Sequence, residues 1–184
     1  IEKHLSPGSR GDLGEIILFE EIDSTNAESL RLLKAGRTGS WIVLAQSQTA
    51  GRGRSGRSWS SYPGAGIYLS LVRRFTLAAD ALQSLSLVTA ISLHAALTAL
   101  GVQNLQLKWP NDVLHEKRKL AGILLELHKM ESTLHVVFGV GINLDLPAQD
   151  GLKRAGLFPA PQSDPALSAA WPVAILRAIP NCPG

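Results

Sequence analysis

The sequence predicts an α+β fold in which helices pack on a mixed, largely antiparallel sheet. Strand-like and helical runs do not alternate strictly along the chain, which argues against a repeating β-α-β architecture. Residues 113–115 and 120–127 are apolar and flank the charged segment Glu116-Lys-Arg-Lys119, so they must form an antiparallel hairpin. Residues 81–107 carry no Asp, Glu, Lys or Arg, which indicates one long buried helix within this stretch.

Length and composition restrict the class of protein. The 184 residues suffice for one good core and barely for two domains. A hydrophobic content of 45% with 18% charged residues is typical of a soluble globular chain. The net charge of +3 is too small to argue for nucleic-acid binding. The single cysteine, Cys182, allows no disulfide framework or cysteine-based metal site within one chain, and we expect a cytoplasmic protein.

The chain divides into three regions. Residues 1–14 are polar, lack the apolar core of a signal peptide, and are expected to be a loose lead-in to a core over 15–146. Residues 147–184 are rich in proline and are expected to hold one short helix near 172–178. Polar residues interrupt the run 81–107 at near-helical spacing, which favours a buried amphipathic helix over 80–100 and not a membrane span.

A strand over 15–22 and a helix over 27–35 are the first expected elements. Thr25 and Glu28 have the spacing of a capping box, and Gly36 stands where a left-handed C-terminal cap is expected.

The segment Asp23-Ser-Thr-Asn26 before this helix allows two interpretations. Ser24, Thr25 and Asn26 are common helix caps and need have no other role. Their two hydroxyls and one amide also converge as donors and acceptors, which would suit a ureido group.

Residues 47–59, which we call the Gly-Arg loop, interleave arginines with glycines between expected strands over 41–45 and 67–72. So many glycines disfavour a helix or strand, so we expect a loop mounted on a sheet. The loop would close over a polyanionic small molecule, or it would be a solvated basic loop or unspecific nucleic-acid patch. Gln48, at its mouth, can both donate and accept hydrogen bonds. The loop's arginines are Arg52, Arg54 and Arg57, its glycines are Gly51, Gly53 and Gly56, and Trp59 closes it.

A short strand over 105–108 is expected to end in Trp109-Pro-Asn-Asp112, because Pro110 cannot continue a central ladder. Asn111 and Asp112 would be found in a turn in any case. Lys108 also brings a cation close to the Asp112 carboxylate, a pair that can neutralise phosphate and hold Mg²⁺ or orient a neighbouring lysine.

Two further segments carry candidate residues. Lys119 directly precedes Leu120-Ala-Gly-Ile123, where Gly122 permits a close approach of the backbone. The segment Gly139-Val-Gly-Ile-Asn143 follows an expected strand over 134–140. Its glycines would let a base or ligand pack on the backbone, and Asn143 could read an adenine edge; a strand ending in a glycine-containing turn is the simpler alternative.

Taken in order, these motifs closely resemble the catalytic domain of biotin protein ligase over roughly residues 16–146. The Gly-Arg loop together with Lys108-Trp-Pro-Asn-Asp112 is specific to that family, whereas no single motif would be. The resemblance implies a fold like the class II aminoacyl-tRNA synthetase core. It also implies a monofunctional enzyme, because neither the helix-turn-helix DNA-binding domain of some members nor the usual β-rich C-terminal domain is recognisable.

The implied activity is ATP-dependent ligation in two steps. Biotin is activated to biotinyl-5′-AMP with Mg²⁺ and ATP, and biotin is then transferred to a lysine of a biotin carboxyl carrier protein. Family members often form homodimers through sheet edges. The alternatives are a lipoate or octanoate ligase or transferase on the same fold, a non-catalytic biotin-binding module, and a nucleic-acid protein using the Gly-Arg loop.

The resemblance also implies roles for individual residues. Lys119, Arg54 and Lys108 would be catalytic, through stabilisation of charge and positioning, since no covalent nucleophile is needed. Biotin would be bound by Ser24, Thr25, Asn26, Gln48, Gly51, Arg52, Gly53, Arg54, Lys119 and Gly122. ATP and the adenylate would be bound by Arg52, Arg54, Arg57, Trp59, Lys108, Asn111, Asp112 and Asn143, with Trp59 as an apolar lid against the adenine and Asp112 as a ligand of Mg²⁺.

Overall fold

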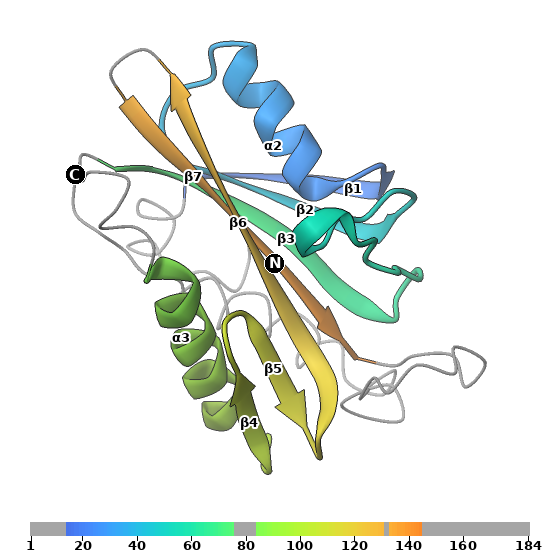
Figure 1. Cartoon of the computed structure of the whole chain (residues 1–184). Coiled ribbons are helices and arrows are strands. Elements are labelled where there is room, and N and C mark those ends of the chain that lie inside the picture. Colours follow the sequence, from blue (N-terminus) through green and yellow to red (C-terminus); the bar gives the residue numbers. More distant parts are fainter. Residues whose placement is uncertain (1–13, 76–83, 131–132, 145–184) are drawn as a thin grey trace.

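The structure is a computed structural model, and it describes residues 14–75, 84–130 and 133–144 (Figure 1). The expectations for residues 1–13 and for the proline-rich segment 147–184, with its short helix, lie outside these ranges.

A seven-stranded sheet with the order β1-β2-β3-β7-β6-β5-β4 forms the core of the described chain (Figure 1). β1 and β2 pair in parallel and the remaining neighbours are antiparallel, so the predicted α+β class is confirmed. The strands are β1 (Glu15–Ile22), β2 (Trp41–Gln48), β3 (Gly66–Phe75), β4 (Leu105–Lys108), β5 (Asp112–His115), β6 (Arg118–Met130) and β7 (Thr133–Asn143). The helices are α2 (Thr25–Lys34), α3 (Leu85–Ala99) and the 3-10 turn η2 (Arg54–Gly56).

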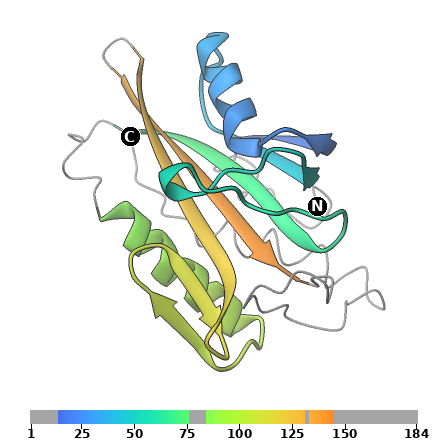
Figure 2. The ribbon, with the colours of Figure 1, turned by 45° about the vertical axis from the view of Figure 1, so that its right-hand side comes forward.

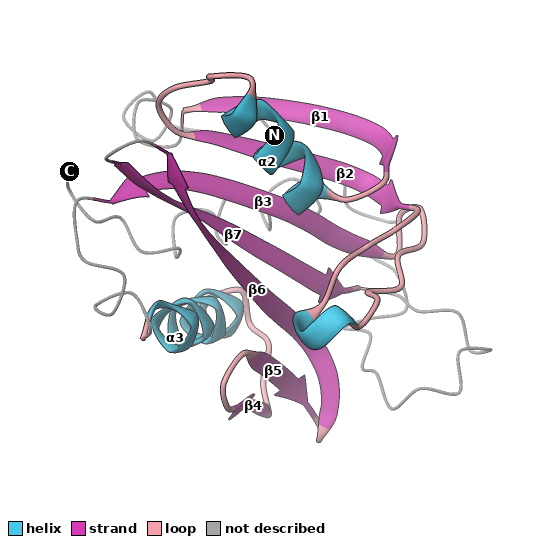
Figure 3. Cartoon of the chain, turned by 45° about the horizontal axis from the view of Figure 1, so that its top comes forward, coloured by secondary structure: helices cyan, strands magenta, loops and turns pink. Residues whose placement is uncertain are grey.

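The two helices cover opposite faces of the sheet (Figure 3). In β2, Trp41 and Val43 pack with Leu33 of α2, whereas Ile42 and Leu44 belong to the larger core that includes α3. This alternation follows from the two-residue period of a strand. Apolar packing with α2 covers only part of one face of the sheet, which we call the α2 face. The Gly-Arg loop lies over the part of this face that β6 and β7 form (Figure 2).

The cap of α2 differs from the prediction. Ser24 is the N-cap, and its side chain accepts a hydrogen bond from the Ala27 amide. The capping box of Thr25 and Glu28 is wrong, because the Thr25 amide and hydroxyl both donate to Gln48 and Glu28 pairs with Arg31. Gly36 has a φ of 83°, as expected for the residue that ends a helix in the left-handed region.

Three strand boundaries also differ. Glu116 and Lys117 alone form the hairpin turn, both with positive φ, as a two-residue turn requires, so Lys119 lies within β6 and not in a charged tip. Gly139-Val-Gly-Ile-Asn143 belongs to β7 and does not form a turn after it, because it pairs with β3 and β6. β2 extends to Gln48, which brings that side chain to the start of the loop.

α3 (Leu85–Ala99) lies within its predicted range of 80–100, and residues 80–83 of that range lie outside the described residues. It begins at Leu85 and ends before Gly101, whose φ of 90° is again left-handed. Within the described ranges, no helix combines the length and the apolar character needed to cross a membrane.

Candidate functional site

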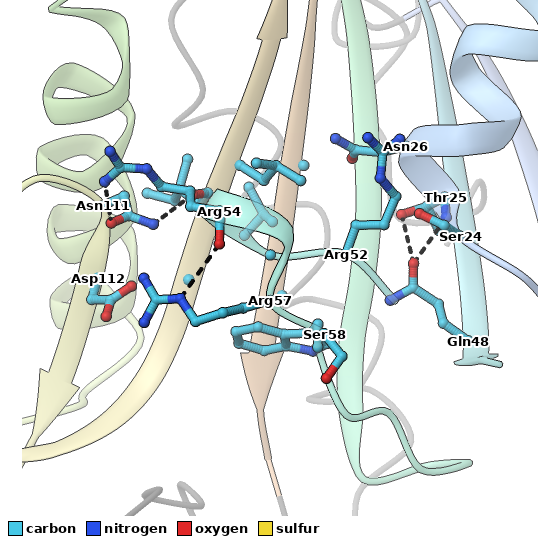
Figure 4. A pocket seen from close by; sticks show the side chains of 18 of the residues that line it. Ser24, Thr25, Asn26, Gln48, Arg52, Arg54, Arg57, Ser58, Asn111 and Asp112 are labelled. Atoms are coloured by element: carbon cyan, nitrogen blue, oxygen red, sulfur yellow. Dashed lines mark hydrogen bonds between the residues drawn. The ribbon is translucent and has the colours of Figure 1, made fainter. Parts of the chain in front are cut away.

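A cavity of about 300 Å³ opens on the α2 face, between the start of α2, the Gly-Arg loop and the strands β6 and β7 (Figure 4). This volume is at the lower end of the range for small-molecule sites. Most of the residues predicted for a site line it, although they come from five separate segments. They are Ser24, Thr25, Asn26, Gln48, Arg52, Gly53, Arg54, Arg57, Trp59, Asn111, Asp112, Lys119, Gly122 and Asn143.

Two predicted residues are placed differently. Gly51 does not line the cavity; its carbonyl accepts from the Trp59 amide at 2.8 Å, and a Cβ there would lie 2.4 Å from the Trp59 carbonyl oxygen. Lys108 is exposed on the edge strand β4, opposite Asp112, and does not line the cavity.

One end of the cavity is a buried polar network around the start of α2. The Gln48 Oε1 atom accepts from the Thr25 amide at 2.9 Å and from the Thr25 hydroxyl at 3.2 Å (Figure 4). Ser70 of β3 lies below them, with its Oγ 2.8 Å from the Thr25 Oγ1 atom. Because the Gln48 oxygen is occupied in this way, its amide N–H groups are the part left to donate to a ligand.

Both polar atoms of the Asn26 side-chain amide form hydrogen bonds. Its Oδ1 atom accepts from the Ser70 hydroxyl at 2.5 Å, and its Nδ2 atom donates to the Glu126 carboxylate at 2.7 Å. Gly139 leaves the space for this side chain, because a Cβ there would lie 2.2 Å from Asn26 Oδ1.

The opposite end of the cavity carries the cation Lys119. Its Nζ atom lies 2.8 Å from the Asp112 carboxylate and 5.2 Å from the centre of the Trp59 ring. Asn143 lines the cavity and is buried, its Nδ2 atom donates to the Lys119 carbonyl at 3.1 Å, and its Oδ1 atom is a buried acceptor without a hydrogen-bond partner in the structure. Asp112 and Trp59 therefore hold the Lys119 side chain, and Asn143 holds its backbone.

Trp59 lies flat against the sheet over two cross-strand glycines. A Cβ at Gly122 or Gly141 would come within 2.7 Å or 2.6 Å of its ring, and the two glycines are paired in the β6–β7 ladder. The aromatic group that packs on the glycine backbone in this structure is therefore a side chain of the protein itself.

The arginines of the loop make different contacts. Arg52 donates to Glu126 of β6 at 2.7 Å, and Arg54 donates at 3.0 Å to Asn111, which in turn donates to the Ile123 carbonyl. Arg57 donates to the Arg54 carbonyl at 3.4 Å (Figure 4). Two arginines thus tie the loop to the sheet and to the turn after β4, while their guanidinium groups still border the cavity.

A salt bridge supports the loop before α2 from the solvent side. The Arg31 guanidinium forms two hydrogen bonds with Asp23 and lowers the pKa of that carboxyl to about 2. Asp23 also accepts from the Ser24 amide, so the same carboxylate orients the start of the helix.

Sequence reasoning missed two residues that organise this site. Ser70 lies between Leu69 and Leu71, and Glu126 lies between Leu125 and Leu127, and each interruption of an apolar run is the signal that could have identified the residue. The cavity is also lined by Ser58, Leu69, Ile123, Leu124, Gly139, Val140 and Gly141, which were not among the predicted site residues.

The site offers little to a metal by itself. Asp112 is the single carboxylate among the described residues that line the cavity, and it is paired with Lys119. Within the described ranges, no three His, Cys, Asp or Glu side chains group together as metal ligands. One carboxylate fits Mg²⁺ that is held mainly by substrate phosphates and water.

Comparison with known proteins gives a consistent result. A model of the biotin/lipoate A/B protein ligase family matches residues 18–143. The chain is 42% identical over 137 residues to the bifunctional ligase/repressor BirA of Salmonella typhimurium, covering 74% of this chain and 42% of that protein. It is 44% identical over 145 residues to the biotin–[acetyl-CoA-carboxylase] ligase of Paracoccus denitrificans, covering 77% of this chain and 60% of that protein.

A solved structure extends the similarity to three dimensions. Biotin protein ligase from Aquifex aeolicus, in complex with biotin and ATP, superposes with a TM-score of 0.70 at 30% identity. The alignment covers 90% of this chain and 68% of that one. The chain spans about two-fifths of the length of the first curated relatives, 42% and 41%.

Proposed function

The chain belongs to the biotin/lipoate A/B protein ligase family, and we propose that it acts there as a biotin ligase. It would convert biotin and ATP to biotinyl-5′-AMP and pyrophosphate, and then transfer biotin to a lysine of a biotin carboxyl carrier protein in the cytoplasm. The observation that carries this proposal is that the polar segment 24–26, the Gly-Arg loop and Lys119 all border one cavity.

The two ends of the cavity suit the two ends of biotin. The ureido group has a carbonyl acceptor and two N–H donors, which match the amide of Gln48 and the hydroxyls of Ser24 and Thr25. Trp59 with Gly122 offers an apolar surface between the polar end and Lys119. A biotin bound along this line directs its carboxylate toward Lys119.

The first step joins two anions, so its catalysis requires neutralisation of charge and positioning. Lys119, Arg54 and Arg57 would stabilise the carboxylate and the α-phosphate while the pyrophosphate leaves. Lys108, which is exposed on β4 outside the cavity, would act on the departing phosphates. Mg²⁺ would neutralise further phosphate charge, with Asp112 as the one protein carboxylate available in the cavity.

The adenine would lie at the Lys119 end of the cavity. The buried Oδ1 atom of Asn143 has no hydrogen-bond partner in the structure and would accept from the adenine amino group, and Asn111 also lines the cavity. Trp59, already stacked on the sheet, would cover one face of the bound adenylate.

The second step needs the adenylate to survive until the acceptor arrives. A mixed anhydride hydrolyses in water, so a loop that excludes water preserves it. The carrier lysine amine would then attack the acyl carbon, and AMP would leave.

Biotin ligation is favoured over the lipoate alternative, because the Paracoccus denitrificans relative is named a biotin ligase and the Aquifex aeolicus structure contains biotin. A homodimer through the edge strands β1 or β4 stays a prediction, and sedimentation of the chain with and without biotin and ATP would test it.

The test is to incubate the chain with labelled biotin, Mg-ATP and an isolated biotin carboxyl carrier domain, with lipoate as competitor. We expect labelled carrier, and no inhibition by lipoate at concentrations where unlabelled biotin competes. Preferential inhibition by lipoate would assign the site to the alternative substrate. Binding of biotin without adenylate would indicate a non-catalytic module.

A further inference from the structure

Glu126 connects two parts of the site that are far apart in the sequence. One oxygen of its carboxylate accepts from Asn26 at 2.7 Å, and the other accepts from the Arg52 guanidinium at 2.7 Å. Asn26 belongs to the start of α2, and Arg52 belongs to the Gly-Arg loop. Figure 4 shows the Arg52 side chain extending from the loop toward Asn26.

Glu126 belongs to a strand that is paired with its neighbour. It lies in the middle of β6, opposite Val137 of β7, on the face that α2 covers. Its side chain is 18% exposed, compared with 45% for Arg52, so the carboxylate is the more buried partner. The carboxylate is partly buried, and the two donors offset the desolvation that this burial costs.

Glu126 also decides how Asn26 is oriented. The Asn26 oxygen accepts from the buried Ser70, so its nitrogen must point to Glu126. Without the carboxylate, the Asn26 amide could rotate, and the loop would lose its one ion pair with the central sheet among the described residues.

We propose that Glu126 is a positioning residue that ties the Gly-Arg loop to the head-group end of the cavity through Arg52 and Asn26. It does not line the cavity. Its function is to hold the loop over the site and to keep the Asn26 amide in its observed orientation beside the loop. This inference rests on the proposed function only for its effect on biotin and the adenylate.

The first experiment needs no ligand. Hydrogen exchange is compared between the wild-type chain, Glu126→Gln, Glu126→Ala and the control Glu116→Gln, which alters an exposed acid at the hairpin tip. We expect at least severalfold faster exchange in peptides spanning 24–28 and 50–59 for both Glu126 variants, and no change for the control. Unchanged exchange in those two segments would overturn the proposal. Glu126→Gln has the same shape as the wild type, so it serves if Glu126→Ala does not fold.

The second experiment is a double-mutant cycle on the rate at which biotinyl-AMP is released. We expect Glu126→Ala and Arg52→Ala each to speed release about tenfold, and the double variant to release it no more than about twofold faster than either. Release that multiplies the two single effects would mean that the residues act separately, and would overturn the proposed link.

The two experiments separate two kinds of failure. If the wild type forms no adenylate, the proposed function fails, while the exchange result still decides the role of Glu126. If exchange rises equally in all described strands, Glu126 is only a general stability residue, and the positioning role is wrong.

Discussion

At the scale of single residues, three glycines of β6 and β7 make room for side chains that line the cavity. The absence of a Cβ at Gly139 admits Asn26, and its absence at Gly122 and Gly141 admits the Trp59 ring. None of these three glycines has a positive φ, so the backbone conformation does not require glycine at these positions. Their importance lies in close contact with side chains from other segments.

Gly139→Ala tests this account directly. The new Cβ would stand 2.2 Å from Asn26 Oδ1, so Asn26 must move and lose its bonds to Ser70 and Glu126. We expect biotin affinity to fall about tenfold, equivalent to roughly 1.4 kcal/mol. Isothermal titration of biotin measures it.

Asn26→Ala supplies the matched control for that substitution. It removes the group with which the new Cβ collides, so Gly139→Ala should cost little further affinity in the Asn26→Ala background. An equal loss in both backgrounds would show that the effect of Gly139 does not pass through Asn26.

The Gly-Arg loop is the element on which the site depends. It is fastened by Arg52 to β6 and by Arg54 to Asn111, and Trp59 anchors its C-terminal end on the sheet. Its 3-10 turn needs positive φ at Ser55 and Gly56.

Arg54→Ala should loosen one of these attachments. We expect biotinyl-AMP to be released about tenfold faster, since a charge-assisted hydrogen bond contributes roughly 1.5 kcal/mol or more. Biotinylation of proteins should become correspondingly less selective. The off-rate can be followed by chasing labelled adenylate with unlabelled biotin and ATP.

Asn111→Ala is the complementary variant, because it removes the partner and keeps the arginine. It should reproduce the faster release if the contact matters. An off-rate unchanged in both variants would exclude this attachment as part of the lid.

The elements themselves were largely predictable, and their extents were less so. β1 and β4 match the predicted ranges, because apolar runs and a proline mark them clearly. The prediction placed the N-cap of α2 at Thr25, one residue after the observed N-cap, Ser24. The amide and hydroxyl of Thr25 donate instead to Gln48, which is 23 residues away in the sequence. Local spacing contains no information about such a distant partner.

At the scale of the whole molecule, the sheet order brings the site together. β3 pairs with β7, so Ser70 reaches Asn26 beside Gly139. The family resemblance supplied the candidate residues, and most of them line the cavity. Ser70 and Glu126 were not predicted, because their importance comes from pairing between strands that are distant in the sequence.

The stability of the whole fold should depend on pH through a histidine pair. His128 and His135 lie opposite each other in β6 and β7, and burial is the main cause that lowers the pKa of each. Glu126 raises the pKa of His128, whereas Lys34 and Arg52 lower it; Arg74 and His128 lower that of His135. The unfolded chain therefore binds protons more readily than the folded one.

Stability should accordingly decrease as the pH falls below about 6.5, the ordinary value for histidine. The slope should be well below the limit of about 1.4 kcal/mol per pH unit for each histidine, because solvent screens both side chains. Urea unfolding between pH 8 and 5 measures it. The double variant His128→Gln/His135→Gln should flatten the dependence of stability on pH, and the control His94→Gln, on α3, should keep the slope of the wild type. Equal slopes in the wild type and both variants would contradict the assignment.

The most direct test of the central claim is the formation of labelled biotinyl-AMP from biotin and Mg-ATP in a single turnover. The wild-type chain should form it, and Lys119→Ala should form it about a hundredfold more slowly, in line with the loss of a principal electrostatic group. Lys129→Ala, which removes an exposed lysine further along the same strand, should behave as the wild type. A folded wild-type chain that forms no adenylate, or a Lys119→Ala variant that forms it at the wild-type rate, would contradict the site described here.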